Sequence, residues 1–295
     1  MTLLNKLTPA RIVAWVVLVL MLLVTVFPLV FVVKTSLVPA SDLYTTSTDL
    51  LPRHATLIHY KKVLGMLSTE ESIAAGGSGA NFNISQSLIN SILFTGIIVI
   101  AQTFNCALAA YAFARIPFRG SKVLFGSFVA SMMVPGVVTM IPNFILIRDL
   151  GLLNSMAGMV APFFLMHGFT VFFLRQFFLS LPKEIEEAAC IDGAGPFVIF
   201  FKIALPLSWA PLMTIATLTT INMWNEFLWP FLIGKEASMH TLPVALQSFK
   251  SQTPQGQPDW SGLMAATVIA TIPTVAMLFF FGRRIVESVQ FTGGK

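Results

Sequence analysis

Long apolar runs constrain this sequence more than any other feature. Six segments each hold about 20 mostly apolar residues, the length that an α-helix needs to cross the hydrocarbon core of a bilayer. They are Ile12 to Val33, Leu88 to Ala112, Val123 to Ile147, Met156 to Leu174, Ala204 to Leu228 and Leu263 to Phe281. The composition agrees, since 56% of the residues are hydrophobic and only 11% are charged, values outside the soluble globular range. The sequence therefore predicts an all-α polytopic membrane protein with six transmembrane helices.

The distribution of lysine and arginine predicts how these helices are oriented. Cytoplasmic loops carry an excess of both residues, and with the N-terminus inside, the inner segments hold most of them. Both termini are therefore predicted to be cytoplasmic, with an N-terminal segment 1–11, a membrane domain 12–282 and a C-terminal tail 283–295. Segment 35–86 becomes a long extracytoplasmic loop. We expect the first apolar run to be retained as a membrane helix, because it is longer than the apolar core of a signal peptide.

One polar interval, between the fourth and fifth apolar runs, concentrates acidic residues in a chain that has few. Leu181 to Pro206 holds three glutamates and an aspartate within a dozen residues. Ser180 followed by Pro182 predicts a helix start, and Gly193 predicts its end because glycine adopts the left-handed conformation without a steric clash. The interval thus predicts a short cytoplasmic helix over about 182–193. One narrow stripe on that helix is formed by Ile185, Ala188, Ala189 and Asp192.

This short helix has two interpretations. An amphipathic helix can lie on the bilayer surface, but anionic lipids of the inner leaflet attract basic helices and repel acidic ones. Docking to another protein is the interpretation that the acidic side chains favour, and the alanines of the stripe would let that protein approach closely.

Polar side chains within the apolar runs are the candidates for a translocation path. They are Gln102, Asn105, Asn143 and His167. Hydrogen bonds between helices explain the three amides equally well. For His167, which lies inside the fourth apolar run, such a bond is the simpler interpretation, and a role in binding a proton or a substrate is the alternative.

Asn225 and Glu226 end the fifth apolar run on the predicted outer side, beside Trp224 and Trp229. Tryptophan is typical of the membrane interface, where it anchors a helix. Asn225 and Glu226 are candidates for contact with a cavity or with a soluble partner that docks from outside.

The sequence lacks the motifs by which it would bind a nucleotide or a metal ion. It has no G-x-x-x-x-G-K-[ST] loop, so ATP-driven transport would need a separate chain to hydrolyse ATP. Its four histidines and two cysteines show no metal-site spacing. The net charge of +5 does not indicate nucleic acid either, because the basic residues lie at the ends of apolar runs.

The polar interval also contains the pattern E-A-A-x3-G-x9-I-x-L-P, formed by Glu187, Ala188, Ala189, Gly193, Ile203, Leu205 and Pro206. This pattern resembles the EAA signature of the inner-membrane permease subunits of binding-protein-dependent ABC importers. Further stretches resemble the carbohydrate branch, in particular its second, maltose-type permease subunit: Ala110 to Arg115, Ile141-Pro142 with Gly151-Leu152, Leu174 to Phe178, Ile191 to Ala194 and Trp224 to Phe227.

The resemblance implies a function and a set of partners. The signature residues, with Glu186 and Asp192 beside them, would form a coupling helix seated in a cytoplasmic ATPase subunit. Two such ATPases would bind ATP and Mg²⁺, so this chain would hold no cofactor and would not be an enzyme. A homologous permease subunit would complete the channel in the bacterial inner membrane, and an extracytoplasmic solute-binding protein would deliver a sugar or oligosaccharide. The tail Ser288 to Lys295 can also reach the ATPase pair in this family.

Two other classes of function compete with an ABC importer. A secondary transporter or channel is compatible with six helices, but it would need an ionisable relay in the membrane, for which His167 is the one good candidate. An intramembrane enzyme would need a catalytic pair at membrane depth, and the apolar runs contain no serine-histidine or aspartate pair.

Overall fold

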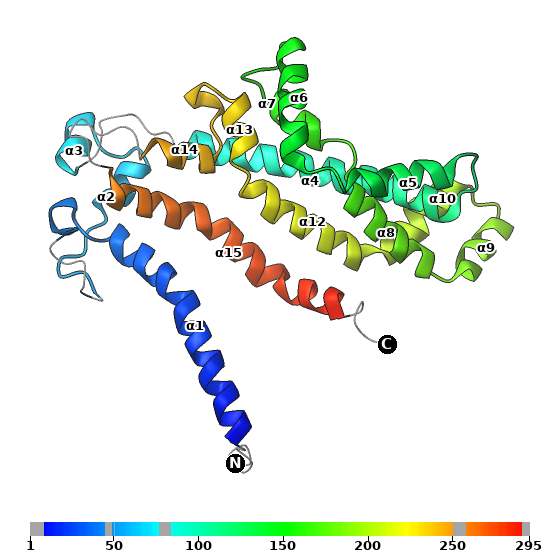
Figure 1. The fold of residues 1–295 in the computed structure, drawn as a ribbon, viewed down its shortest axis with the longest axis horizontal. Helices are drawn as coiled ribbons and strands as arrows, with labels where there is room; N and C mark the ends of the chain where they lie inside the picture. Colours follow the sequence, from blue (N-terminus) through cyan, green and yellow to red (C-terminus); the bar gives the residue numbers. More distant parts are fainter. Residues whose placement is uncertain (1–8, 45–48, 50, 77–83, 250–257, 291–295) are drawn as a thin grey trace. The chain divides into compact units, whose positions relative to one another are not determined.

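The computed structural model describes residues 9–44, 49, 51–76, 84–249 and 258–290. Over these residues the chain is predominantly helical and contains no β-strand (Figure 1). It divides into two compact units, the first formed by residues 1–84 and 246–271 and the second by residues 85–245 and 272–295. The end of the predicted tail, 291–295, and most of the glycine-rich stretch of the predicted outer loop, 77–80, lie outside the described residues.

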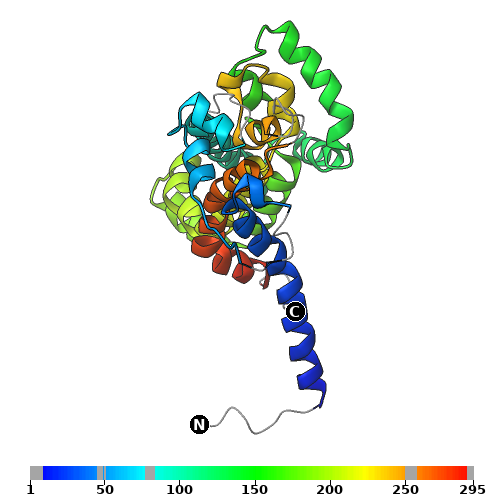
Figure 2. The ribbon, with the colours of Figure 1, turned by 90° about the vertical axis from the view of Figure 1, so that its left-hand side faces the viewer.

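The first unit begins with one long apolar helix, α1 (Pro9–Ser36), which Figure 2 shows as a single uninterrupted helix. Its apolar side chains are exposed around its circumference, the pattern of a helix that lipid solvates. The remaining elements of this unit are η1 (Ala40–Asp42), α2 (Ile58–Val63), α3 (Thr69–Ala74) and the first part of α15 (Trp260–Gln290). Ser68 and Glu71 form a capping box on α3, so the described part of the predicted outer loop includes a second α-helix after α2.

A buried ion pair joins α2 to the residue that precedes α15. Lys62 Nζ pairs with Asp259 Oδ2, and their side chains are only 6% and 5% exposed. Asp259 Oδ1 also accepts a hydrogen bond of 2.9 Å from the backbone N–H of Gly262, in the first turn of α15. His59 Nε2 lies 3.0 Å from the carbonyl oxygen of Val38. These contacts hold α2, the segment after α1 and the start of α15 together.

His59 is expected to make the stability of this unit depend on pH. Burial, followed by the nearby Lys62 cation, lowers the pKa of His59 below its usual value of 6.5, against smaller opposing effects of Asp259 and the Val38 carbonyl. A histidine whose pKa is lower in the folded state contributes stability that is complete above the unfolded pKa and is lost as pH falls through the folded pKa. The protection of residues 58–63 against hydrogen exchange, expressed relative to the intrinsic exchange rate at each pH, should therefore be lower at acidic pH than at neutral pH. His59→Gln should remove most of that difference, and an unchanged pH dependence in this variant would contradict the assignment.

The second unit begins with α4 (Ile84–Arg115) and continues through a series of shorter helices. They are α5 (Ser121–Ser131), α6 (Gly136–Asp149), α7 (Met156–Val160), η2 (Ala161–Phe163), α8 (Gly168–Ser180), α9 (Lys183–Ile191), α10 (Pro196–Ile199), the π-helical turn η3 (Phe200–Ala204), α11 (Leu205–Leu207), α12 (Trp209–Trp224), α13 (Leu228–Ile233) and η4 (Ala237–Met239). α14 (Leu242–Ser248) and α15 each cross the boundary between the two units. The segment from Phe231 to Trp260 contains the short helices η4 and α14.

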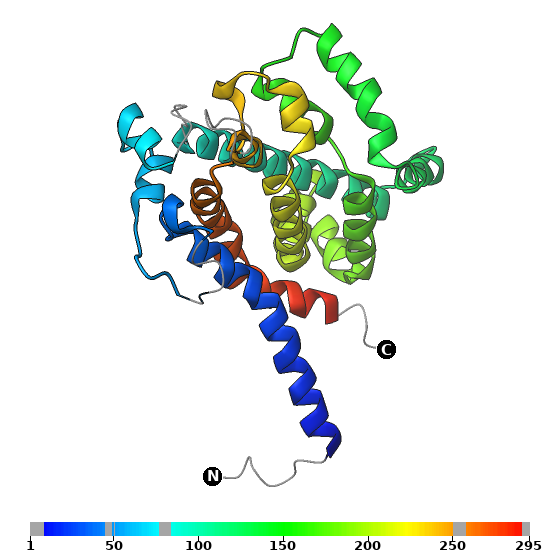
Figure 3. The same ribbon diagram turned by 60° about the vertical axis from the view of Figure 1, so that its left-hand side comes forward.

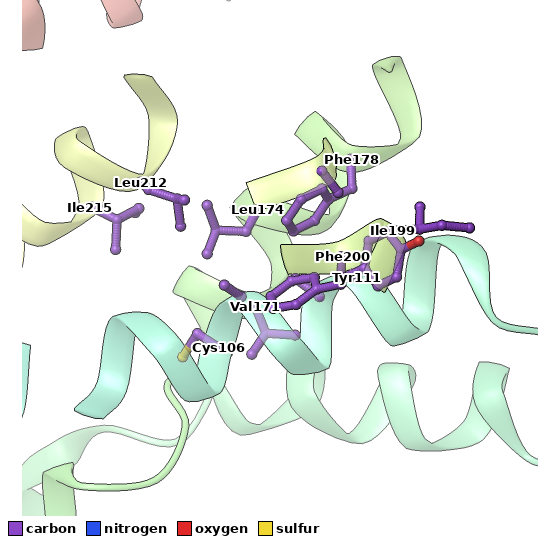
Figure 4. Packing of buried hydrophobic residues seen from close by; sticks show 12 residues of the cluster. Cys106, Tyr111, Val171, Leu174, Phe178, Ile199, Phe200, Leu212 and Ile215 are labelled. Atoms are coloured by element: carbon purple, nitrogen blue, oxygen red, sulfur yellow. The ribbon is translucent and has the colours of Figure 1, made fainter. Parts of the chain in front are cut away.

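Two buried clusters form the core of the second unit. The first joins α4, α8, α12 and the turn around α10 and η3, and Figure 4 shows Tyr111, Leu174, Phe178 and Phe200 within it. The second joins α4 with α6, α7 and α13 around Phe94, Met159 and Trp229. Close packing of such side chains fixes the helices that carry them.

Three predicted spans are bent where the sequence indicated one continuous helix. The direction changes by 101° between α5 and α6, by 49° between Met156–Phe163 and α8, and by 76° between Pro196–Leu207 and α12. Figure 3 shows α6 at a steep angle to α5. Hydropathy alone cannot detect such bends, because both arms of each pair remain apolar.

A proline lies within two residues of each of these breaks. Pro135 immediately precedes α6, Pro162 lies in η2, and Pro206 lies in α11; proline lacks a backbone N–H and disfavours helix at the residue before it. After the second break, α8 begins in close contact with α5. A Cβ atom on Gly168 would lie 2.6 Å from the carbonyl oxygen of Phe128, so this approach requires glycine.

By length and apolar composition, two helices among the described residues, α1 and α4, can each cross a bilayer without interruption. Counting each bent pair as one span raises this number to at most five. The sixth predicted segment, Leu263 to Phe281, lies within α15, whose described apolar part, Trp260–Ala276, is shorter than a full span.

Candidate functional site

The short helix α9 lies within the polar interval, and its start differs from the one predicted. Pro182 occupies the N-cap position, and no side chain caps the free N–H groups of α9. Ser180 is the last residue of α8, where its Oγ donates a hydrogen bond of 2.7 Å to the Phe177 carbonyl. The predicted cap by Ser180 is therefore wrong, because its hydroxyl binds back to the preceding turn of α8.

The end of α9 is fixed by a left-handed glycine. Gly193 has φ of 82°, its N–H donates to the Cys190 carbonyl at 3.0 Å, and the N–H of Ala194 donates to the Ala189 carbonyl at 2.9 Å. These two bonds form a Schellman motif. Gly195 then precedes Pro196, which lies in the first turn of α10. The backbone thus sets the direction in which the chain leaves α9.

One face of α9 is open and apolar at its centre. Ile191 is 87% exposed and Ile185 is 43% exposed, with Ala188 exposed between them. Glu184, Glu187 and Asp192 are also exposed around these apolar side chains. We call the set Glu184, Ile185, Glu187, Ala188, Ile191 and Asp192 the exposed face of α9. Large exposed apolar side chains with a polar rim are typical of a surface that binds another protein.

The opposite face of α9 packs against the chain's own core. Ala189 contacts the first buried cluster. Glu186 Oε1 lies 3.0 Å from Arg115 Nε, with side chains 15% and 6% exposed, within ion-pair distance although without the geometry of a hydrogen bond. The Tyr111 hydroxyl donates to Glu186 Oε2 at 3.4 Å. The predicted stripe is therefore divided between the two faces, and Glu186 points toward α4.

Two arginines connect the neighbouring ends of α4 and α8. Arg115, at the end of α4, donates from Nη2 to the Leu181 carbonyl between α8 and α9 at 2.6 Å. Arg175 of α8 donates from Nε to the Phe113 carbonyl of α4 at 3.2 Å. Its guanidinium also lies over the Phe125 ring, 4.2 Å from the ring centroid. Neither contact was predicted from the sequence, although the charge of Arg115 at the end of an apolar run was a signal for a buried partner.

The last three residues of the E-A-A pattern do not lie on α9. Ile203 is in η3, and Leu205 and Pro206 are in α11. Ile203 and Leu205 pack against the first buried cluster, and Pro206 is exposed. The structure therefore places these residues where the chain leaves the site and enters α12.

Two of the four candidate path residues bond to one helix break. Gln102 Nε2 donates to the Phe163 carbonyl and Asn105 Nδ2 donates to the Phe164 carbonyl, each at 3.1 Å. Both carbonyls lie where η2 ends before α8 begins, so the amides satisfy backbone groups that the break has freed. For these amides the sequence allowed two interpretations, a translocation path or hydrogen bonds between helices, and the bonds observed here are of the second kind.

The two other candidates have different environments. His167 has an extended backbone at the N-cap of α8 and is not inside a helix as predicted, and its Nδ1 lies 3.5 Å from Thr170 Oγ1. Asn143 is half-buried on α6.

Asn225 and Glu226 form local bonds after α12. Glu226 Oε1 accepts a hydrogen bond of 3.0 Å from the backbone N–H of Trp229, in the first turn of α13. Asn225 Nδ2 donates to the Ile221 carbonyl at 2.7 Å. Trp229 is 5% exposed and donates from Nε1 to the Met159 carbonyl.

Comparison with known families gives a match over more than half of the chain. Residues 105–290 match the family described as the inner membrane component of binding-protein-dependent transport systems. The matched region includes α9 and both arginines that contact the neighbouring chain segments.

Individual relatives span nearly the whole chain. The arabinooligosaccharides transport system permease protein AraQ of Halalkalibacterium halodurans is 31% identical over 274 residues, which are 92% of this chain and 92% of that protein. The sn-glycerol-3-phosphate transport system permease protein UgpE of Agrobacterium fabrum is 31% identical over 286 residues, 96% of this chain and 97% of that protein.

One solved structure shares the fold. It is a chain of a bacterial ABC transporter involved in the import of the acidic polysaccharide alginate, with a TM-score of 0.80 and 23% identity. The match covers 95% of this chain and 99% of that chain. At this identity the similarity shows the helical fold alone.

Proposed function

Because this chain belongs to the family of inner-membrane components of binding-protein-dependent transport systems, we propose that α9 is the coupling helix on which a partner ATPase acts. The chain is a transport subunit of an ABC importer in the inner membrane. The exposed face of α9 carries this proposal. Its apolar centre is open, while its opposite face and its C-terminal turn are fixed. A helix held in this way can transmit displacement from a bound partner to the helices behind it.

The proposed topology keeps the orientation predicted from the sequence. Each bent pair would count as one span and α15 as the last, which gives six spans with both termini cytoplasmic. The positive-inside distribution supports this orientation, and it places α9 in the cytoplasm. Segment 35–86 would lie outside the cell, and 283–295 would be the cytoplasmic tail.

The proposed solute is a sugar, an oligosaccharide or a related hydroxyl-rich compound. Relatives that span over nine-tenths of the chain are named for arabinooligosaccharides and for sn-glycerol-3-phosphate, which supports this class without selecting a member. The proposed assembly contains a homologous permease subunit, two ATPase subunits that bind ATP and Mg²⁺, and an extracytoplasmic solute-binding protein. ATP hydrolysis would then take place in the partner chains.

Reconstitution tests the proposed function directly. The chain would be purified in detergent with its co-purifying partners, placed in vesicles and supplied with the solute-binding protein and candidate sugars. We expect ATP hydrolysis to rise when both are added, with uptake that depends on ATP. Isolation of the chain without any ATPase, together with uptake driven by an ion gradient, would contradict the proposal and favour a secondary transporter.

The exposed face itself predicts the effect of one substitution. Ile191→Asp would place a charge at the centre of an apolar contact, so we expect the ATPase to dissociate more readily, with about tenfold or greater loss of affinity as for a central interface residue. The measurement is the fraction of the ATPase that still co-purifies with the chain after detergent washes of increasing volume. Ile73→Asp is the control, because Ile73 is also exposed, at 45%, on the short helix α3. Equal retention of the ATPase by both variants would show that Ile191 is not in the interface.

A further inference from the structure

We infer that Arg115 and Glu186 are positioning residues that make α9 and the C-terminal end of α4 move as one body. This inference rests on the proposed role of α9 as the coupling helix and extends it. It adds α4 to the segments that receive displacement from the ATPase.

The guanidinium of Arg115 makes two contacts within the chain. It binds Leu181 and Glu186 at once, with one nitrogen on a backbone carbonyl at 2.6 Å and another facing a carboxylate at 3.0 Å. The side chain of Arg115 is 6% exposed. A buried guanidinium is rigid and planar, so two contacts on its fork fix the direction of the group as well as its distance.

Arg115 connects the residue just before α9 with a residue inside α9. Leu181 lies just before α9, and Glu186 lies within it. Tyr111, one turn earlier on α4, also donates to the Glu186 carboxylate at 3.4 Å. The start of α9 is therefore held by two residues of α4, although the two helices are distant in the sequence.

The helix α8 holds α4 from the other side. Arg175 donates to the Phe113 carbonyl at 3.2 Å, which satisfies one of the carbonyls left free at the end of α4. Arg115, at the end of α4, thus binds the Leu181 carbonyl just after α8, and Arg175 of α8 binds the Phe113 carbonyl of α4. Because the contacts run in both directions, the ends of α4 and α8 cannot separate without breaking a charged hydrogen bond.

These contacts give displacement of α9 a second route into the membrane domain. The first route is the backbone, through Gly193 and α10 to α12. The second runs through Arg115 into α4, whose Asn105 and Gln102 bond to the break between η2 and α8. Asn105 lies about 15 Å along α4 from Arg115 at the helical rise per residue, so a shift of the helix end reaches the candidate path.

Four variants test this inference by uptake. Arg115→Gln and Glu186→Gln are each expected to lower ATP-driven uptake about tenfold or more, because each leaves the other charge buried without its partner. Arg115→Lys should give a smaller loss. An ammonium keeps the positive charge near Glu186, although it cannot make both contacts of the guanidinium fork. The exchange of charges, Arg115→Glu with Glu186→Arg, should recover part of the uptake. Arg119→Gln, which removes an exposed arginine just after α4, is the matched control and should stay within about twofold, as is usual for surface substitutions.

A distance measurement distinguishes a positioning role of Arg115 and Glu186 from a role in stabilising the fold alone. Cys190 is exposed on α9, whereas Cys106 is buried, so a spin label can be placed on Cys190 and a second on Ile116→Cys, just beyond α4. In complexes whose partner chains lack accessible cysteines, we expect one narrow distance that is the same without nucleotide and with trapped ATP. In the Arg115→Gln variant the distance should broaden and should change when ATP is trapped.

The outcomes are distinguishable from failure of the proposed function. If no ATPase accompanies the wild-type chain, the coupling role itself fails, and this inference fails with it. If the wild type is coupled but both glutamine variants keep uptake within about twofold and keep the narrow distance, the inference alone is overturned. Where a single variant does not assemble, the charge exchange decides: assembly with recovered uptake supports the inference, and assembly without recovery contradicts it.

Discussion

Gly193→Val is expected to reduce ATP-coupled uptake to a few per cent of the wild-type rate while the chain still inserts and assembles. Gly193 has φ of 82°, a conformation that costs a β-branched residue about 2 kcal/mol. That strain corresponds to a roughly thirtyfold smaller population of the native turn. The Schellman bonds from Gly193 and Ala194 would be lost, so α9 would no longer leave at a fixed angle toward α10.

The measurement is uptake of labelled solute per unit of assembled complex, with the ATPase activity of the same sample. Gly195→Ala is the matched control, because Gly195 has φ of −76° and no atom lies within 4 Å of a Cβ placed there. It should transport at the wild-type rate. Gly193→Asn should be intermediate, since asparagine tolerates the left-handed region better than valine. If valine at this position supports uptake within about threefold of asparagine, backbone strain of this size does not control coupling.

The position of α9 could be predicted from the sequence, but the orientation of its faces could not. The E-A-A pattern and Gly193 located a short helix over about 182–193, and the structure has α9 at Lys183–Ile191. The sequence could not show which face of α9 is free. Alanines at helical spacing suggested that Ala188 and Ala189 face the same partner, whereas Ala189 packs inward beside Glu186.

The reason is that the inner face depends on a distant part of the chain. Glu186 is one of three glutamates in the interval, and only Arg115 and Tyr111 of α4 distinguish it from its neighbours. Such pairing depends on how the helices pack, which local patterns do not encode. The apolar runs predicted the fold class for the opposite reason, since crossing a bilayer requires an apolar helix whatever its neighbours are.

The bends between helices could be predicted from the sequence only in part. Pro135, Pro162 and Pro206 were visible as interruptions, and breaks of this kind are tolerated where other groups satisfy the freed backbone. The sequence did not specify that Gln102 and Asn105 of α4 supply those groups, nor that one bend reaches 101°. The prolines therefore marked only candidate positions, since Pro28, Pro142 and Pro273 lie inside continuous helices; the packing decided which breaks form and at what angles.

The buried pair of Lys62 and Asp259 leads to the prediction with the largest effect on stability. Lys62→Met would leave the Asp259 carboxylate buried, at 5% exposure, without a counter-charge. Removal of one member of such a pair typically costs about 3 to 5 kcal/mol. We expect a loss of that size in the free energy of unfolding, measured by denaturation of the purified chain in detergent, and faster hydrogen exchange over residues 58–63.

A double variant separates the uncompensated charge from lost packing. Lys62→Met with Asp259→Asn removes both charges, while the asparagine oxygen can still accept the hydrogen bond from Gly262 that caps α15. It should therefore recover most of the stability that Lys62→Met loses. Arg53→Met is the matched control: Arg53 pairs with Asp49 at 2.8 Å, but the side chains are 69% and 32% exposed, and an exposed pair contributes about 1 kcal/mol or less. If Lys62→Met and Arg53→Met cost the same, burial of the pair does not hold α2 against α15, because the two pairs differ mainly in exposure to water.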